Sequence, residues 1–130
     1  MATILKFSEA VSIAFHTMSY LTKNIDRLVG TKEIADSLKV SENHLSKVLQ
    51  RLVKAGFLES IRGPKGGFVI KDKKNKISLL EVYEAVDGPL KLSNCLLGNS
   101  VCNNDDNCLF GNLINDINKQ IKDYLKQKVF

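Results

Sequence analysis

The sequence predicts a mainly α-helical fold with one small β-hairpin. Two observations support this prediction. Apolar residues recur at helical spacing through most of the 130-residue chain. Only two short runs, residues 57–61 and 68–70, are typical of strands, and the glycine-rich stretch between them is typical of a turn. A chain of this length can bury one core and carry an additional element, but not two large cores.

The first predicted helix covers residues 7–22. One face of this segment is apolar, and its residues are Phe7, Val11, Ala14, Phe15, Met18 and Leu21. Charged and hydroxyl residues interrupt the beginning of the chain, which argues against a signal peptide and against a membrane-spanning helix there. We therefore expect a cytoplasmic protein with no membrane partner.

Two helices are predicted within residues 31–55. The first runs from Thr31 to about Leu38 and the second from Ser41 to about Ala55, so the short link between them must be a tight turn. Ser41 is the expected N-cap residue of the second helix. The apolar face of that helix consists of Leu45, Val48, Leu49 and Leu52. The opposite face carries hydrogen-bond donors and positive charge, on Asn43, His44, Ser46, Lys47, Gln50 and Arg51.

A basic hairpin is predicted directly after these helices. Gly56 is placed to end the second helix, and Arg62 and Lys65 would project from the turn RGPKGG. Helix, turn, helix and hairpin in this order are typical of a winged helix-turn-helix, whose second helix enters the DNA major groove. Lys and Arg outnumber Asp and Glu by 12 to 5 in residues 27–76, but the numbers are equal, 4 to 4, in residues 95–130. This distribution favours a phosphate-binding surface; a helical domain with an ordinary basic surface is the alternative.

The sequence after residue 76 predicts a role other than DNA binding. We expect a DNA-binding domain in residues 1–76 and a sensor and dimerisation part in residues 77–130. Ser78 and Glu81 have the spacing of a capping box, and Gly88-Pro89 would end the helix that begins there. A long C-terminal dimerisation helix is expected after Cys108, with an apolar stripe made by Phe110, Leu113, Ile114, Ile117, Ile121, Tyr124 and Leu125. Pairing of two copies would present two reading helices to a palindromic operator; packing of the stripe on its own domain is the alternative.

All three cysteines lie within residues 95–108, with the spacing C-x₆-C-x₅-C. Three thiolates in one loop can hold an iron–sulfur cluster or a zinc ion, whereas free thiols or a disulfide switch are the alternatives. The candidates for a fourth ligand are Asp105, Asp106, Glu9, His16 and His44. The sequence contains no nucleotide-binding loop, no paired acid and base carboxylates and no Cys/His nucleophile arrangement. An enzyme is therefore not expected.

The reading helix, the wing RGPKGGF and the three-cysteine loop before the last helix together resemble the IscR/NsrR-type winged helix-turn-helix transcriptional regulators. Nearly the whole chain takes part in this resemblance, from KFSEA near its start to the terminal helix. The resemblance implies a homodimeric repressor that binds double-stranded DNA. It also implies control by a [2Fe–2S] or [4Fe–4S] cluster that responds to nitric oxide, redox state or iron–sulfur status.

The resemblance assigns the site residues as well. Cys95, Cys102 and Cys108 would hold the cluster, and Glu9 of the partner subunit would complete it, as in NsrR-like members. IscR-like members have a ligand histidine where this chain has Gly111. By the resemblance, the residues that would contact DNA are Ser41, Asn43, His44, Ser46 and Lys47, with Arg62 and Lys65 on the wing. Gln50 and Arg51, on the same polar face of the helix, are predicted DNA contacts as well. The alternative is a cluster-free regulator switched by cysteine oxidation or by another ligand.

Overall fold

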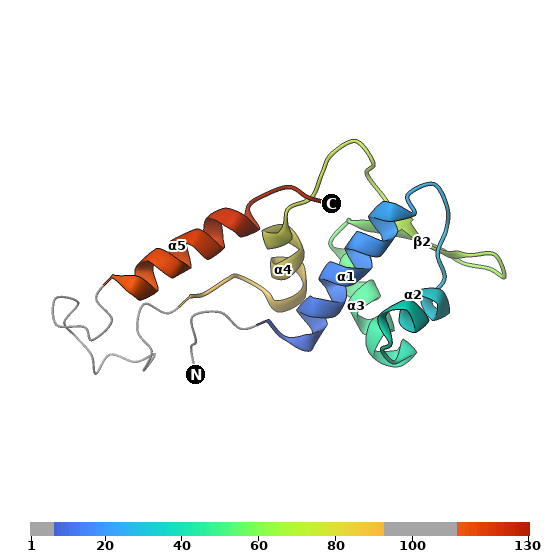
Figure 1. The fold of residues 1–130 in the computed structure, drawn as a ribbon. Helices are drawn as coiled ribbons and strands as arrows, with labels where there is room; N and C mark the ends of the chain where they lie inside the picture. The colour runs from blue at the N-terminus through green and yellow to red at the C-terminus, as the bar shows by residue number, and fades with distance from the viewer. Residues whose placement is uncertain (1–6, 93–111) are drawn as a thin grey trace.

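The computed structural model describes residues 7–92 and 112–130 (Figure 1). All three cysteines and Phe110 lie outside these ranges. The described elements are α1 (Glu9–Lys23), α2 (Thr31–Leu38), α3 (Glu42–Lys54), β1 (Leu58–Ile61), β2 (Gly67–Ile70), α4 (Leu79–Asp87) and α5 (Leu113–Leu125). The predicted fold class, mainly helical with a small hairpin, is confirmed. None of the described helices has both the length and the apolar character that crossing a bilayer requires.

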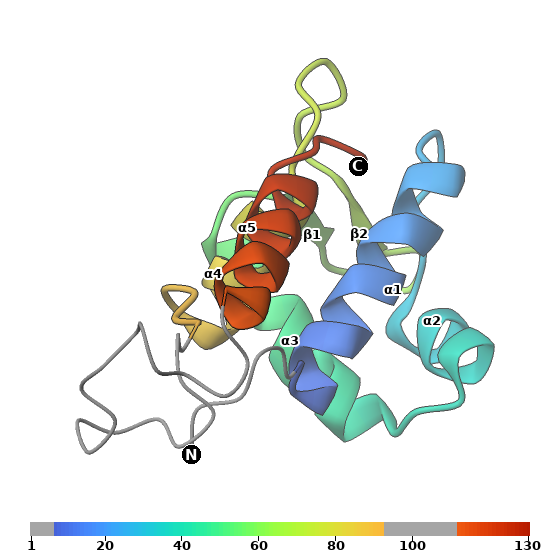
Figure 2. The ribbon, with the colours of Figure 1, turned by 60° about the vertical axis from the view of Figure 1, so that its left-hand side comes forward.

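The core lies where α1, α3 and α4 meet. Figure 2 shows α1 crossing α3, with α2 beside them. The predicted apolar face of α3 is the face that packs, because its four residues Leu45, Val48, Leu49 and Leu52 are all buried. On α1, Val11, Met18 and Leu21 are almost completely buried as well. Burying one such side chain contributes about 1.5–3 kcal/mol, so this contact holds α3 firmly in place.

The turn between α2 and α3 is tight, as the two-residue link predicts. Lys39 adopts the left-handed conformation, with φ 57° and ψ 44°, although it is not a glycine. The amide of Val40 donates to the carbonyl oxygen of Ala35 at 3.1 Å, which closes the end of α2. Ser41 is the N-cap residue of α3, as expected: its hydroxyl accepts from the amide of His44 at 3.1 Å.

The hairpin is antiparallel and pairs Leu58 with Ile70 at its base and Ile61 with Gly67 at its tip. It is held to the helices by a short bridge in which Val29 and Phe68 exchange two backbone hydrogen bonds of 3.0 and 2.8 Å. Gly67 lies at this bridge, where an added Cβ would come within 2.6 Å of the carbonyl oxygen of Val29. The close approach of two backbones therefore requires glycine at that position.

Helix α4 begins with the predicted capping box. The Ser78 hydroxyl accepts from the amide of Glu81 at 3.0 Å, and the Glu81 carboxylate accepts from the amide of Ser78 at 2.7 Å. Ile77, Val82 and Val86 belong to the same buried cluster as the apolar side chains of α1 and α3. The start of the predicted second part is thus packed into the core of the first.

Helix α5 is shorter than predicted. It covers 13 residues, and the chain after Leu125 turns back instead of continuing as a helix to its end. The Ile77 amide donates a hydrogen bond of 2.9 Å to the Phe130 carbonyl oxygen, and the Phe130 amide donates one of 3.1 Å to the Ile77 carbonyl oxygen. The predicted apolar stripe is only partly covered, because Leu113 is 53% exposed and Tyr124 is 61% exposed.

Candidate nucleic-acid interface

The face of α3 that points away from the core carries an unbroken polar stripe. Asn43, Lys47, Gln50 and Lys54 are spaced at i, i+4, i+7 and i+11, and all four are exposed. We call these four residues the outer stripe. Three of them are among the residues predicted to contact DNA. Lys54 was missed by the sequence reasoning, although its distance of seven residues from Lys47 places it on the same face.

Two other predicted residues of α3 lie on a second face, turned toward the ends of neighbouring helices. The His44 Nδ1 atom is 3.7 Å from a carboxylate oxygen of Glu9, the first residue of α1. The Arg51 Nη1 atom donates to the carbonyl oxygen of Val86 in the last turn of α4, at 2.7 Å. We call His44 and Arg51 the side stripe. Both residues interact within the protein.

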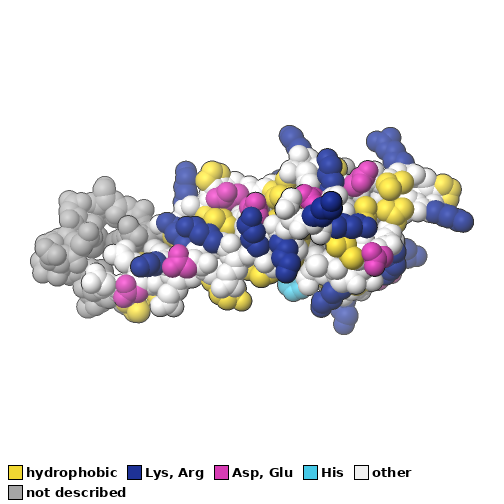
Figure 3. Space-filling model, turned by 90° about the horizontal axis from the view of Figure 1, so that it is seen from above, with side chains coloured by type: hydrophobic (Ala, Val, Ile, Leu, Met, Phe, Trp, Pro, Cys, Tyr) yellow, Lys and Arg dark blue, Asp and Glu magenta, His cyan; other side chains and the backbone are white. Residues whose placement is uncertain are grey.

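The wing carries the last two predicted DNA contacts, Arg62 and Lys65, and both are exposed. Figure 3 shows basic side chains projecting from the hairpin end of the molecule, on the right. The turn is closed by a hydrogen bond of 2.9 Å from the amide of Gly66 to the carbonyl oxygen of Gly63. Because Gly63 has a φ of 122°, the turn depends on a conformation that side-chain-bearing residues rarely adopt.

A groove of about 490 Å³ separates α3 from the hairpin. The residues that line it are Gln50, Val53 and Lys54 from α3 and Ser60, Arg62 and Phe68 from the hairpin. The outer stripe therefore leads into a groove whose other wall is the wing. Ser60 was not predicted as a site residue, because a lone exposed serine on a strand carries no signal of its own.

The start of α2 is fixed to the end of α1 by a charged network. The Glu33 carboxylate accepts hydrogen bonds from the Arg27 guanidinium, one of them at 3.0 Å, and from the Tyr20 hydroxyl at 2.5 Å. The hydrogen bonds from Arg27, and then the one from Tyr20, lower the pKa of Glu33 from 4.5 to about 2. This carboxylate therefore stays ionised well below neutral pH, and its hydrogen bonds help to position the helix-turn-helix.

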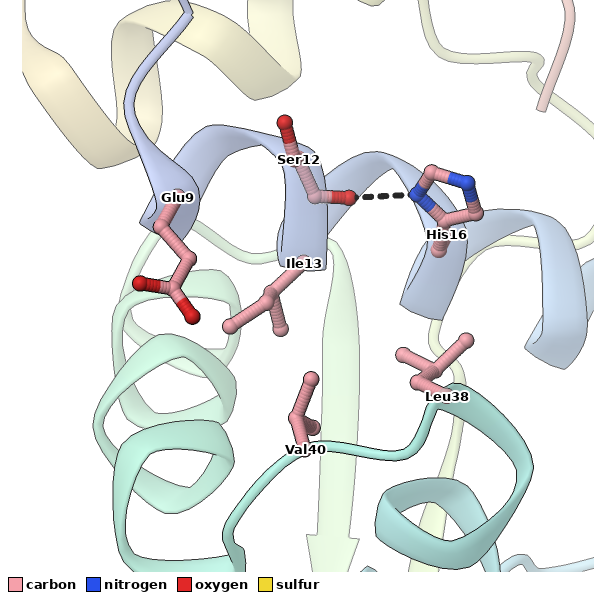
Figure 4. A pocket seen from close by; sticks show the side chains of 6 residues that line it. All are labelled: Glu9, Ser12, Ile13, His16, Leu38 and Val40. Carbon is pink, nitrogen blue, oxygen red and sulfur yellow. Dashed lines mark hydrogen bonds between the residues drawn. The ribbon is translucent and has the colours of Figure 1, made fainter.

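Of the predicted cluster ligands, only Glu9 lies within the described residues. Its side chain is 74% exposed. Glu9 lines a pocket of about 210 Å³ between α1 and the turn that joins α2 to α3, with Ser12, Ile13, His16, Leu38 and Val40 (Figure 4). His16, an alternative ligand, has its Nδ1 atom 2.7 Å from the carbonyl oxygen of Ser12. Within residues 7–92 and 112–130, no three His, Cys, Asp or Glu side chains are grouped as a metal site requires.

The fold and the exposed basic face of α3 define a winged helix-turn-helix protein of the DNA-binding class. A family model described as Rrf2, iron-dependent transcriptional regulator, matches residues 7–129. The chain therefore belongs to the Rrf2 family of transcriptional regulators, and it is not an enzyme.

Individual relatives agree with this assignment. The chain is 34% identical over 122 residues to a putative HTH-type transcriptional regulator of Aquifex aeolicus, covering 92% of this chain and 85% of the relative. It is 40% identical over 77 residues to NsrR of Bacillus licheniformis, covering 59% of this chain and 54% of NsrR. It is 32% identical over 93 residues to IscR of Pectobacterium atrosepticum, covering 72% of this chain and 56% of IscR. The matched region thus spans only about half of the NsrR and IscR sequences.

Solved structures show the same fold. The B. subtilis protein CymR, titled the global cysteine regulator, superposes with a TM-score of 0.75 and is 24% identical, covering 93% of this chain and 89% of CymR. The oxidized form of Staphylococcus aureus CymR superposes with a TM-score of 0.60 and is 25% identical, covering 67% of this chain and 71% of that protein.

Proposed function

We propose that this chain is a homodimeric repressor whose binding to a palindromic operator is controlled by an iron–sulfur cluster, [2Fe–2S] or [4Fe–4S]. The proposed ligands are Cys95, Cys102 and Cys108 of one protomer and Glu9 of the partner subunit. Three thiolates within 14 residues are the donors that such clusters prefer, and the description of the matching family as iron-dependent supports iron. A cluster held there would supply the centre at which nitric oxide or an oxidant reacts.

The observation that carries this proposal is the position of Glu9. Its carboxylate is largely exposed and makes one described contact, the 3.7 Å approach to His44 of α3. A carboxylate in this position is available as a ligand, and it also touches the helix that would read DNA. Whatever moves Glu9 changes the surroundings of His44.

A second connection runs through the end of α4, which leads into the segment that contains the cysteines. The hydroxyl of Ser8, the N-cap residue of α1, donates to the carboxylate of Asp87 at 2.8 Å. Arg51 of α3 holds the neighbouring Val86 carbonyl. The start of α1, the end of α4 and the side stripe of α3 therefore form one junction. A ligand can control DNA binding through this junction only if it favours one of its arrangements over another.

Dimerisation is supported by an apolar groove beside α5 that is open within the described part of the protein. Phe7, Phe15, Leu79, Ile121, Tyr124 and Leu125 line this groove together with Gln120, and its volume is about 460 Å³. Leu113 and Tyr124, both on α5, are more than half exposed. An apolar surface of this kind on a terminal helix suits a two-fold contact with a second copy, which would set two wings and two α3 helices on the two halves of an operator.

Purification under anaerobic conditions tests the proposal directly. The absorption spectrum and the iron and acid-labile sulfide content per protomer are measured for the wild type and for Cys102→Ala and Glu9→Gln. We expect brown wild-type protein with near-stoichiometric iron and sulfide, a large loss in Cys102→Ala, and a changed spectrum or faster loss of iron in Glu9→Gln. Glu84→Gln, which alters an exposed acid of α4, is the matched control and should keep the wild-type values. Colourless wild-type protein after anaerobic reconstitution would refute the cluster and leave DNA binding intact.

Thiol oxidation is the second candidate function, favoured by the similarity to a CymR structure solved in its oxidized form. In that case two of the three cysteines would form a specific disulfide when the protein is oxidised. Mass spectrometry of the oxidised, non-reduced protein would identify the pair. A scrambled mixture of pairs would contradict a built thiol switch.

A further inference from the structure

The lining of the groove between α3 and the wing suits a chain of phosphates. Four polar side chains line it, two of them cationic: Gln50, Lys54, Ser60 and Arg62. The apolar side chains of Val53 and Phe68 complete its wall, and the backbone bridge from Phe68 to Val29 fixes one side. No acidic side chain lines the groove within the described part of the protein.

The strand alternation of the hairpin explains why acid is missing from this surface. Successive side chains of a strand point to opposite faces, so Glu59 of β1 lies on the face opposite to that of Ser60. Both cations of the groove are also available. Across residues 7–92 and 112–130 the ion pairs are Arg27 with Glu33 and His44 with Glu9, and neither involves a groove residue.

We propose that this groove binds the DNA sugar–phosphate backbone at the point where it passes from α3 to the wing, with Lys54 and Ser60 as phosphate contacts. The proposal rests on the DNA binding proposed above and adds two residues to it. Lys54 supplies a point charge and Ser60 a neutral hydroxyl donor, whereas the outer stripe nearer the start of α3 meets base edges. Contacts to phosphate position the protein on the duplex but do not read its sequence.

The assignment to phosphate makes a distinctive prediction about how DNA affinity depends on salt concentration. Each cation that neutralises a phosphate releases counterions, so the slope of log affinity against log salt falls by about 0.9 when that cation is removed. Lys54→Gln should therefore weaken binding to two unrelated duplexes equally and lower the slope by about 0.9 for each Lys54 in contact. Ser60→Ala removes a neutral donor; it should weaken binding on the order of 3–10-fold and leave the slope unchanged.

The experiment measures binding of the full-length protein to two duplexes of unrelated sequence by fluorescence anisotropy, between about 50 and 200 mM salt. Lys54→Arg should retain the wild-type slope, which separates charge from side-chain shape. Lys73→Gln is the matched control for the lost charge, because Lys73 is exposed, belongs to the segment between β2 and α4 and does not line the groove. Melting temperatures of all variants check that each one is folded.

Two outcomes would overturn the assignment. Wild-type affinity and slope in Lys54→Gln would show that the groove does not hold DNA, and an equal fall of the slope in Lys73→Gln would show that only overall charge matters. A loss that differs strongly between the two duplexes would place Lys54 on bases instead of phosphates, which also refutes the proposal. Failure of the wild type to bind either duplex would count against the proposed function itself, and is distinguishable from all of these.

Discussion

The outer and side stripes of α3 differ in what surrounds them. On the outer stripe, the side chains of Asn43, Lys47 and Gln50 are exposed, and none takes part in a hydrogen bond or ion pair with another described residue. On the side stripe, His44 lies against Glu9 and Arg51 is bonded to the carbonyl oxygen of Val86. Both stripes consist of polar residues on one short helix, yet one is free for an external partner and the other holds the protein together.

This difference suggests that α3 has two roles. A helix used only for reading DNA would need no specific contact with the ends of α1 and α4. Here those ends are tied to it, and the end of α4 leads toward the cysteine-containing segment. Under the proposed cluster control, the side stripe would transmit a change near the cysteines to the outer stripe, and variants that affect only one stripe can separate the two roles.

Displacing the wing from its position beside α3 should have the largest effect on stability and on DNA binding. In Gly67→Ala the new Cβ would lie within 2.6–3.1 Å of three backbone atoms of Val29, and backbone cannot yield as a side chain can. We expect a loss of about 1–3 kcal/mol in the free energy of unfolding and weaker DNA binding. Urea unfolding and anisotropy measure the two effects.

The control for this variant is Gly30→Ala. It adds the same methyl group where no atom lies within 4 Å, at a residue with an ordinary φ of −77°. Its stability should stay within about 1 kcal/mol of the wild type, since relief of chain entropy and a poorer N-cap nearly cancel. Equal destabilisation by both changes would show that the Val29 bridge does not anchor the wing.

Substitutions on the two stripes should produce opposite patterns. Lys47→Ala should leave the free energy of unfolding within about 0.5 kcal/mol and weaken operator binding by about 1–3 kcal/mol, because Lys47 is assigned to base edges. Arg51→Ala should cost about 1–2 kcal/mol of stability, because it leaves the Val86 carbonyl without its charged donor. If instead Arg51→Ala changed DNA binding as Lys47→Ala does and left stability unaltered, the division into two stripes would be wrong.

The division of α3 into an outer stripe and a side stripe could not have been predicted from the sequence. Helical periodicity correctly gave α2, α3 and the buried face of α3, and the local pattern of Ser78 and Glu81 correctly gave the capping box. These signals depend on neighbours within one or two turns. By contrast, Arg51 bonds to a residue 35 positions away, so nothing near it in the sequence distinguishes it from a free cation.

One error of the sequence reasoning has the same origin. The apolar stripe predicted a last helix that runs to the chain end, but the chain turns after Leu125 and the backbone of residues 127–130 bonds to that of Ile77 and Leu79 instead. Long-range backbone pairing therefore decided where this helix ends. The turn at Lys39 was predicted, but its left-handed conformation was not, because a lysine does not signal it as a glycine would. The roles of the cysteines stay predictions, because those residues lie outside the described ranges.

The smallest expected effect concerns acid, and it tests how firmly α2, and with it the start of α3, is held. The pKa of Glu33 is about 2 in the folded protein and 4.5 as the ordinary value, so between these pH values the unfolded state binds more protons. The stabilisation is therefore complete above pH 4.5 and is lost as the pH falls toward 2.

In urea unfolding, Glu33→Gln should be less stable than the wild type at neutral pH, and this difference should shrink steadily below pH 4.5. Because the Glu33 side chain is 41% exposed, solvent screening keeps the difference small. Glu59→Gln, which removes an exposed acid of β1 that forms no described ion pair, is the matched control. A pH-independent difference for Glu33→Gln would mean that the network with Arg27 and Tyr20 acts through packing and not through the charge of the carboxylate.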